Sequence, residues 1–294
     1  MTSVVLITGA ATGIGNLTAR ALAAAGHTVY ASMLDVAGRS REHARELEDT
    51  AKSEGWDLRV VELDVQSQRS AETAVATVLD ERGRLDTVVH NAGHLYIGYV
   101  EAFTPADVQR LFDINTVGIQ RVNRAVLPHM RHNHGGTLLY VGSTTSVVLP
   151  PFLGPYVASK IAADALAQAT AYEVGQFGIE TTIVMPGPFT QGTDHFPNAS
   201  RAGDEQRSHA YAALDDLVAS LGGAVEALFS TDAHPRAVAD EIVRILALPP
   251  GTRPFRSVVD FTDAGVEQVN DVLFEAQRRF NNRLGFGDLM PNWA

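Results

Sequence analysis

Short apolar runs alternate with longer amphipathic stretches through most of the chain. The runs Val4-Val5-Leu6-Ile7 and Thr87-Val88-Val89-His90 are continuous and rich in β-branched residues, as strands buried on both faces of a parallel sheet are. Alternation of such strands with helical patterns is typical of βαβ units. The sequence predicts strands at 4–7, 28–31, 59–63, 87–90, 137–141, 180–185 and 257–259, and helices at 16–25, 39–53, 67–81, 105–131, 155–177 and 235–246.

These elements predict a three-layer α/β fold of the Rossmann-like, doubly wound type, with about seven parallel strands and helices on both faces. No repeat or linker divides the first 187 residues, so we expect a single domain over residues 1–294. Residues 188–233 carry no clear strand, and a long insertion after a strand is typical of a substrate-binding lid. Residues 263–294 are predicted to form a helix and a tail.

A glycine-rich turn joins the first predicted strand to the first predicted helix. Its sequence is Thr8-Gly9-Ala10-Ala11-Thr12-Gly13-Ile14-Gly15. Glycines here allow a tight bend and close approach of the main chain to a pyrophosphate, which the helix N-terminus would bind. The spacing G-x-x-x-G-x-G differs from the commoner G-x-G-x-x-G, and a purely structural turn is the alternative.

A tyrosine and a lysine, Tyr156 and Lys160, lie four residues apart in a predicted helix. This spacing puts both side chains on one face of the helix. A tyrosine has an ordinary pKa of about 10, and a neighbouring ammonium would stabilise its phenolate, so Tyr156 could exchange protons with a substrate near neutral pH. Such pairs are common by chance, so the meaning of this one depends on the other motifs of the chain.

Further short motifs accompany this pair, and together they resemble the short-chain dehydrogenase/reductase family over about residues 3–260. The resemblance implies an enzyme that transfers a hydride between a nicotinamide cofactor and a ketone or secondary alcohol. Besides the glycine turn and the Tyr156/Lys160 pair, the motifs are Asn91-Ala92-Gly93, Asn115, Ser143 at thirteen residues before Tyr156, and Pro186-Gly187.

The resemblance implies a role for four catalytic residues. Tyr156 would be the general acid in reduction and the general base in oxidation, while Lys160 would lower its pKa and bind the ribose hydroxyls. Ser143 would hydrogen-bond the reacting oxygen. Asn115 would kink its helix and position a water in a proton relay. A strand-end turn for Ser143 and an ordinary polar group in a helix for Asn115 are the alternatives.

The resemblance also implies the cofactor contacts. Asp64 would accept a hydrogen bond from the adenine amine, and Thr190 would bind the carboxamide, although the family's threonine often lies one residue later, where this chain has Gln191. His90 stands where the family more often has asparagine, and we interpret it as a packed strand-end histidine. The predicted set is Thr8, Gly9, Thr12, Gly13, Ile14, Gly15, Met33, Leu34, Asp35, Asp64, Val65, Asn91, Ala92, Gly93, Tyr156, Lys160, Pro186, Gly187, Phe189 and Thr190.

The choice between NAD(H) and NADP(H) depends on the residues after the second strand. The acidic position typical of NAD enzymes falls on Met33, and the basic position typical of NADP enzymes falls on Leu34, so neither signal is present. Asp35 is close enough to contact the ribose and would repel a 2′-phosphate, whereas Arg39 and Arg41 could offset that repulsion. On balance the sequence favours NAD(H).

Substrate contacts are expected from the insertion and from loops at the carboxyl edge of the sheet. The candidates are mostly apolar or aromatic, which predicts a bulky hydrophobic ketone or secondary alcohol; packing within the lid is the alternative. No cluster of basic residues accompanies them, which argues against an anionic substrate. The candidates are Leu95, Tyr96, Thr145, Leu149, Phe152, Leu153, Phe189, Phe196 and Tyr211.

Composition narrows the remaining possibilities. The net charge of −11, without runs of Lys or Arg, argues against nucleic acid or an anionic membrane as partner. The absence of cysteine excludes disulfides and thiolate metal sites, and no apolar stretch approaches the roughly 18 residues of a membrane span, so we expect a cytoplasmic protein. His129, His132 and His134 lie at a helix end without a carboxylate partner, so we expect no metal.

The sequence leaves three hypotheses for the function and one for the oligomeric state. A carbonyl reductase or alcohol dehydrogenase is favoured by the glycine pattern and the Ser143–Tyr156 spacing. An epimerase or dehydratase could reuse the same pair, and an NAD(P)-sensing regulator could keep the fold without catalysis, although such proteins typically lose the tyrosine or lysine. Small residues along 161–169 permit close approach of helices, so we expect a homodimer or homotetramer.

Overall fold

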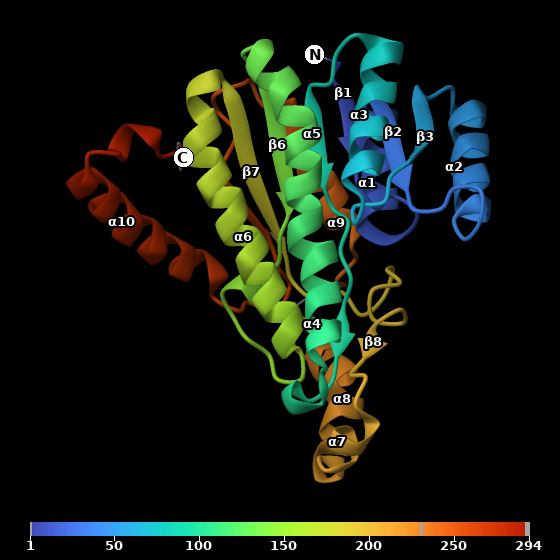
Figure 1. Cartoon of the computed structure of the whole chain (residues 1–294), viewed down its shortest axis with the longest axis vertical. Helices are drawn as coiled ribbons and strands as arrows, with labels where there is room; N and C mark the ends of the chain where they lie inside the picture. Colours follow the sequence, from blue (N-terminus) through green and yellow to red (C-terminus); the bar gives the residue numbers. More distant parts are fainter. Residues whose placement is uncertain (1, 230–231, 292–294) are drawn as a thin grey trace.

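The computed structural model describes residues 2–229 and 232–291; positions 1, 230, 231 and 292–294 of the predicted domain, lid and tail lie outside the described residues. A parallel seven-stranded sheet forms the centre of the fold, in the order β3-β2-β1-β4-β6-β7-β9. The predicted doubly wound α/β fold is confirmed (Figure 1). The strands are β1 Val4–Ile7, β2 Thr28–Met33, β3 Leu58–Glu62, β4 Thr87–His90, β6 Gly136–Val141, β7 Ile179–Pro186 and β9 Arg256–Val259.

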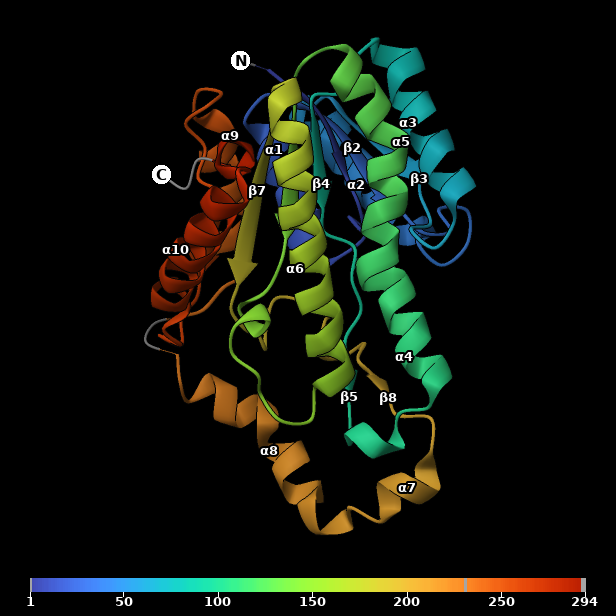
Figure 2. The same ribbon diagram turned by 60° about the vertical axis from the view of Figure 1, so that its left-hand side comes forward.

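Alternate side chains of each central strand enter two separate cores. In β1, Val4 and Leu6 pack in one core, whereas Val5 and Ile7 pack in the other. Because both faces are buried, the strand is apolar throughout, which is why its sequence shows no alternation. Helices α3 Gln68–Arg82, α5 Gly118–His132 and α6 Gly154–Val174 cover the first face, and α1 Gly13–Ala24, α2 Arg41–Glu54 and α9 Arg236–Ala247 cover the second (Figures 1 and 2).

The helix predicted over 105–131 is interrupted. It consists of α4 Pro105–Phe112, a π-helical turn at Asp113–Val117, and α5. Thr104 begins α4 with a capping box, since its hydroxyl accepts from Asp107 N and the Asp107 carboxylate accepts from Thr104 N. The π turn adds one residue to the helical turn, a distortion frequent at functional sites. Here it places Asn115 in the interior.

The described part of the predicted lid, residues 188–229 and 232–233, lies at the carboxyl end of the sheet. Its strand β8 Ser200–Arg201 pairs in parallel with β5 Tyr96–Ile97 of the body, and helices α7 Glu205–His209 and α8 Asp215–Glu226 follow. Figure 2 shows α7 and α8 beyond the ends of the strands. The two-residue pairing of β5 with β8 was not predicted, because so short a strand has no periodicity to detect.

The C-terminal segment forms the predicted helix, α10 Val266–Leu284. Its first turn is anchored by buried Val266 and Asn270, and Gln277 accepts a hydrogen bond from the Tyr172 hydroxyl (3.1 Å). The remainder extends along the outside of the fold (Figure 1). Among the described helices, none combines the length and the hydropathy that crossing a membrane requires.

Candidate active site

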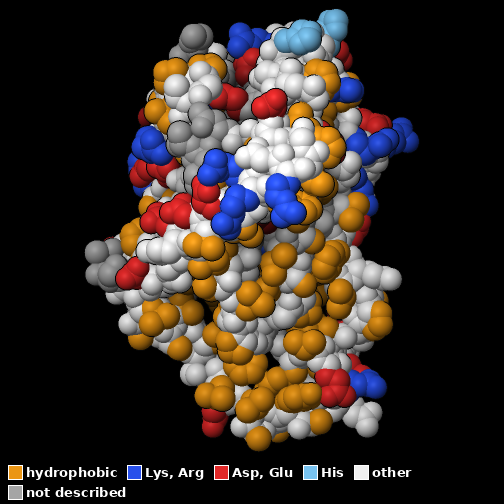
Figure 3. Space-filling view, turned by 90° about the vertical axis from the view of Figure 1, so that its left-hand side faces the viewer, with side chains coloured by type: hydrophobic (Ala, Val, Ile, Leu, Met, Phe, Trp, Pro, Cys, Tyr) orange, Lys and Arg blue, Asp and Glu red, His pale blue; other side chains and the backbone are white. Residues whose placement is uncertain are grey.

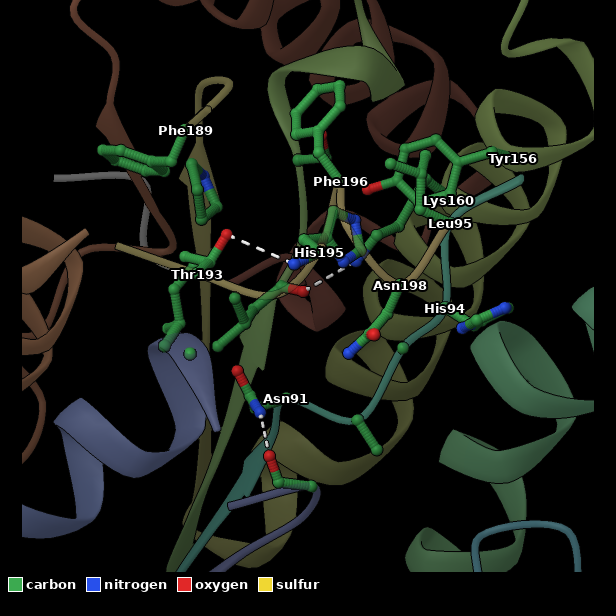
Figure 4. A pocket seen from close by; sticks show the side chains of 18 of the residues that line it. Asn91, His94, Leu95, Tyr156, Lys160, Phe189, Thr193, His195, Phe196 and Asn198 are labelled. Atoms are coloured by element: carbon green, nitrogen blue, oxygen red, sulfur yellow. Dashed lines mark hydrogen bonds between the residues drawn. The ribbon is translucent and has the colours of Figure 1, made fainter. Parts of the chain in front are cut away.

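A cavity of about 1020 Å³ opens at the carboxyl ends of the central strands. Its walls come from the glycine turn between β1 and α1, the ends of β2, β4, β6 and β7, the first turns of α6, and the lid. This is the edge at which open parallel sheets bind ligands. Figure 4 shows side chains of the body and of the lid pointing into the same space.

The glycine turn needs its glycines for conformation and for space. Gly9 and Gly13 have φ values of +67° and +56°, which few other residues adopt. A Cβ atom at Gly15 would lie 2.3 Å from the Gly9 carbonyl oxygen and 2.4 Å from Asn91 Nδ2. Gly9, Gly13 and Ile14 line the cavity at the N-terminus of α1, where the helix favours an anion.

Thr8 ties this turn to the loop after β4. Its hydroxyl oxygen accepts hydrogen bonds from the main-chain N–H groups of Asn91 (2.9 Å) and Ala92 (3.0 Å). Asn91 Nδ2 donates in return to the carbonyl oxygens of Thr8 (2.9 Å) and Gly9 (3.0 Å). Thr8 and Gly15, both predicted as cofactor contacts, therefore lie behind the cavity wall and hold its shape.

Three of the four predicted catalytic residues line the cavity together. Ser143 follows β6, and Tyr156 and Lys160 lie near the start of α6. Lys160 Nζ donates hydrogen bonds to the carbonyl oxygens of Val141 (3.2 Å) and Gly142 (3.2 Å). These bonds fix the ammonium at the end of β6, beside the tyrosine.

Burial changes the acidity of both groups. It raises the pKa of the Tyr156 phenol to about 12, although the Ser143 hydroxyl lowers it in part. Burial also lowers the pKa of the Lys160 ammonium to about 8, and the Asp164 carboxylate partly offsets this decrease. The phenol is therefore protonated at neutral pH and the lysine is largely charged.

Asn115, the fourth predicted catalytic residue, lies behind the cavity wall. Its Oδ1 accepts a hydrogen bond from His94 N (2.8 Å), and its Nδ2 donates to the His94 carbonyl oxygen (2.9 Å) and to Ser159 Oγ (2.9 Å). The amide thus clamps the loop after β4 against α6. Its role in a water relay stays a prediction.

The cavity brings together most of the remaining predicted residues. From the cofactor set these are Gly9, Thr12, Gly13, Ile14, Met33, Leu34, Asp64, Val65, Asn91, Ala92, Gly93, Tyr156, Lys160, Pro186, Gly187 and Phe189, and from the substrate set Leu95, Tyr96, Thr145, Leu149, Leu153, Phe189 and Phe196.

Comparison with known proteins identifies the family of this chain. The family model described as short chain dehydrogenase matches residues 3–202. The 3-ketodihydrosphingosine reductase of Bacteroides thetaiotaomicron is 32% identical over 87% of this chain and 87% of its own length. The chain belongs to the short-chain dehydrogenase/reductase family.

Solved structures of this family superpose closely on the chain. A short-chain dehydrogenase from Streptomyces avermitilis has a TM-score of 0.75 at 25% identity, with 98% of each chain covered. An alcohol dehydrogenase from Thermococcus sibiricus, complexed with 5-hydroxy-NADP, has a TM-score of 0.69 at 25% identity, covering 88% of this chain and 96% of that one. As a short-chain dehydrogenase, the protein is an NAD(P)-dependent oxidoreductase acting on CH–OH or C=O groups.

The lining of this short-chain dehydrogenase fits a nicotinamide dinucleotide. The N-terminus of α1 offers an anion site, Asp64 offers a carboxylate at the end of β3, and Lys160 offers an ammonium near β6. At the β2 end, the structure places Arg39 and Ser40 on the wall. The α1 N-terminus suits phosphates, the Asp64 carboxylate would accept a hydrogen bond from the adenine amine, and the Lys160 ammonium would donate to ribose hydroxyls.

Asp35, which was predicted to contact the ribose, lies off the cavity wall, so that contact stays a prediction. Asp35 adopts a φ of +53° and turns its carboxylate into its own loop, where it accepts a hydrogen bond from Arg39 N (3.0 Å). Arg41 is also directed elsewhere, because its guanidinium donates to the Ala37 carbonyl oxygen. Of these charged groups, only Arg39 lines the cavity.

Three further predicted contacts lie off the cavity wall of this dehydrogenase. Thr190 has a buried hydroxyl without a hydrogen-bond partner among the described residues. Tyr211 stacks on Tyr99 at 4.8 Å and donates to Glu101 Oε2 (2.8 Å), so it braces the lid from outside. Phe152 packs edge-on against Tyr99 at 5.9 Å. The positions of these three side chains depend on local packing, which no sequence motif encodes.

Several lining residues were missed by sequence reasoning. Among them, Leu221, Val225 and Leu228 recur at helical spacing along α8 and its end, a signal that was available. The polar ones from the lid had no such signal, because their position depends on how the lid folds back over the sheet. These include Thr193, Asp194, His195, Asn198 and Ser200, and His94 from the loop after β4 was missed as well.

Two histidines noted in the sequence belong to the scaffold. His90 is buried at the end of β4 and stacks on Tyr140 with ring centroids 4.6 Å apart, as the packed interpretation predicts. Its burial lowers the pKa to about 3, so it is neutral at pH 7. His129 Nε2 accepts a hydrogen bond from Leu85 N (3.2 Å), which joins the end of α5 to the loop before β4.

Proposed function

We propose that this oxidoreductase reduces a bulky hydrophobic ketone, or oxidises the corresponding secondary alcohol. The observation that carries the proposal is the meeting of Ser143 and Tyr156 with an apolar outer wall in one cavity. That wall includes Leu95, Leu153 and Phe196. The lid exposes more apolar surface outside the cavity, and hydrophobic side chains gather on the lower half of the face shown in Figure 3. A relative named for reduction of 3-ketodihydrosphingosine supports a ketone of this kind.

In the proposed reduction, Tyr156 donates its proton to the carbonyl oxygen as negative charge develops there. The raised pKa of its phenol, about 12, keeps that proton in place at neutral pH. Ser143 donates a hydrogen bond to the same oxygen and orients it. Lys160 is the nearby cation that stabilises the phenolate left behind. A bound nicotinamide would supply the hydride in reduction and accept it in oxidation.

We infer that the preferred cofactor is NADP(H), although the sequence favours NAD(H). The reason for expecting NAD(H) was repulsion by Asp35, and the Asp35 carboxylate is engaged within its own loop. Arg39 lines the cavity beside Leu34 and Ser40, where a guanidinium would attract a 2′-phosphate. The Thermococcus sibiricus alcohol dehydrogenase, solved with 5-hydroxy-NADP, supports the same choice.

The test is turnover of NADPH and NADH with aliphatic and aromatic ketones of increasing size. We expect NADPH oxidation that is faster with larger apolar ketones, and loss of at least about a hundredfold in kcat for Tyr156→Phe, since a general acid contributes roughly 10²–10⁴-fold. Binding of NADPH to the variant, followed by fluorescence, should stay within about twofold of wild type. Absence of turnover with every ketone and both cofactors would instead favour the regulator hypothesis. Assembly into a homodimer or homotetramer and a cytoplasmic location stay predictions.

A further inference from the structure

A lid histidine lies directly beside the catalytic tyrosine. The ring centroids of His195 and Tyr156 are 5.7 Å apart, with the planes at 63°. His195 lines the cavity, and Figure 4 shows it between Thr193 and Lys160. Within residues 2–229 and 232–291, no hydrogen bond is seen to either of its ring nitrogens. The proposed proton transfer does not use this side chain. Its ring nitrogens are therefore available for a hydrogen bond to a ligand in the cavity.

The other histidine of the cavity wall, His94, is already engaged in a hydrogen bond. His94 Nε2 lies 2.7 Å from Ser200 Oγ, a hydrogen bond that ties the loop after β4 to strand β8 of the lid. Asn115 holds the main chain of His94 on both sides. His94 therefore fastens the lid, whereas His195 is a lid side chain available to a ligand in the cavity.

The charge state of His195 narrows what that ligand group can be. Burial, together with the positive charge of Lys160 and the proximity of His94, lowers the pKa of His195 to about 4. A neutral imidazole has one donor nitrogen and one acceptor nitrogen. A hydroxyl matches both, while the Lys160 ammonium next to it disfavours an ammonium on the substrate.

We propose that His195 is a specificity-determining residue that binds a hydroxyl on the carbon next to the reacting carbonyl. The inference rests on the proposed function, because it takes Tyr156 to hold the carbonyl oxygen. With the two rings in contact, the two oxygens that they bind must be close neighbours on the substrate. The substrate class is thus an α-hydroxy ketone whose apolar chain lies against Leu221, Val225 and Leu228.

The experiment compares 1-hydroxy-2-decanone with 2-decanone, which differ only in the hydroxyl, using NADPH and NADH. For wild type we expect kcat/KM to favour the hydroxy ketone by about tenfold, the usual effect of one hydrogen bond of this kind. His195→Phe should remove this preference by raising KM for the hydroxy ketone about tenfold more than it raises KM for 2-decanone. His195→Gln, which keeps a donor and an acceptor, should restore part of the preference.

A matched control is His209→Phe, an exposed lid histidine at the end of α7, which should keep the wild-type preference. Equal losses with both ketones in His195→Phe would show that the residue only supports the lid and would overturn the inference. Wild-type turnover of both ketones without a preference would also overturn it while leaving the proposed function intact. Turnover of neither ketone would count against the function and the inference together.

Discussion

Arg39 is the residue on which the cofactor preference depends. It is exposed at the outer end of the cavity, and its guanidinium is near enough to His94 to lower the pKa of that histidine in addition to burial. We predict that Arg39→Ala raises the Kd for NADPH roughly tenfold and changes the Kd for NADH by less than about twofold, because only NADPH carries the 2′-phosphate. Titration of cofactor fluorescence measures both constants.

Arg41 provides the matched control, since its side chain bonds to the Ala37 carbonyl oxygen and lies off the cavity wall. Arg41→Ala should leave both constants near those of wild type. Equal weakening of NADH and NADPH by Arg39→Ala would mean that the arginine contacts a group common to both cofactors, and the NADP(H) proposal would then lose its support.

At this scale, motif residues are predictable and loop residues are not. Ser143, Tyr156 and Lys160 reach the cavity because strand and helix geometry fixes their directions. Asp35 and Thr190 do not reach it, since a left-handed residue in one loop and burial in the other turn them away. The orientation of a loop side chain depends on tertiary contacts that a single sequence does not contain.

Among the elements, the β1–α1 turn couples stability to cofactor binding. A Cβ at Gly15 would meet main-chain oxygen at 2.3 Å, an atom that cannot move without opening the turn. We predict that Gly15→Ala lowers the free energy of unfolding by about 1–3 kcal/mol, as overpacking does, and weakens NADPH binding at least tenfold. Urea unfolding and cofactor titration measure the two effects.

Gly175→Ala is a suitable control, because Gly175 has helical dihedrals at the end of α6 and open space around its Cβ position. It should leave the protein as stable as wild type or slightly more stable. If Gly15→Ala kept wild-type stability and affinity, the close packing of this turn would have no energetic importance.

The strands and long helices were predicted within a few residues because hydrophobic periodicity defines them. The π turn at Asp113–Val117 and the β5–β8 pair were not, although both position site residues. The hydrogen bonds of a π turn span one residue more than those of an α turn, and this difference hardly changes the pattern of hydrophobic positions. The parts of the site that the sequence did not predict are thus the irregular ones. Functional sites often depart from regular geometry in this way.

For the whole molecule, buried polar contacts hold the layers and the last strand together. Asp164 of α6 and Arg256 of β9 form a paired contact with distances of 2.6 and 2.7 Å, and both side chains are nearly inaccessible to solvent. This pair joins the helix that carries Tyr156 and Lys160 to the edge of the sheet. The same carboxylate raises the pKa of Lys160, so this structural ion pair also influences the charge of a catalytic residue.

His90 gives the molecule a built-in sensitivity to acid. Its pKa falls from an ordinary value of 6.5 to about 3 in the fold because burial disfavours the imidazolium. Above pH 6.5 the residue is neutral in both states and contributes no pH dependence. As pH falls from 6.5 towards 3, the unfolded chain binds a proton that the folded protein does not, so stability decreases by about 1.4 kcal/mol per pH unit from this residue.

Urea unfolding of wild type and His90→Phe at pH 7.5 and pH 5.0 measures this effect. Phenylalanine keeps a ring against Tyr140 and removes the titrating group. We predict that wild type loses about 2 kcal/mol more unfolding free energy between the two pH values than His90→Phe does, because 1.5 pH units of that interval lie below 6.5. His132→Gln, a change at an exposed histidine, should lose as much as wild type. Equal losses in wild type and His90→Phe would show that the buried ring of β4 accepts a proton in the folded state, and that the acid sensitivity of the protein lies elsewhere.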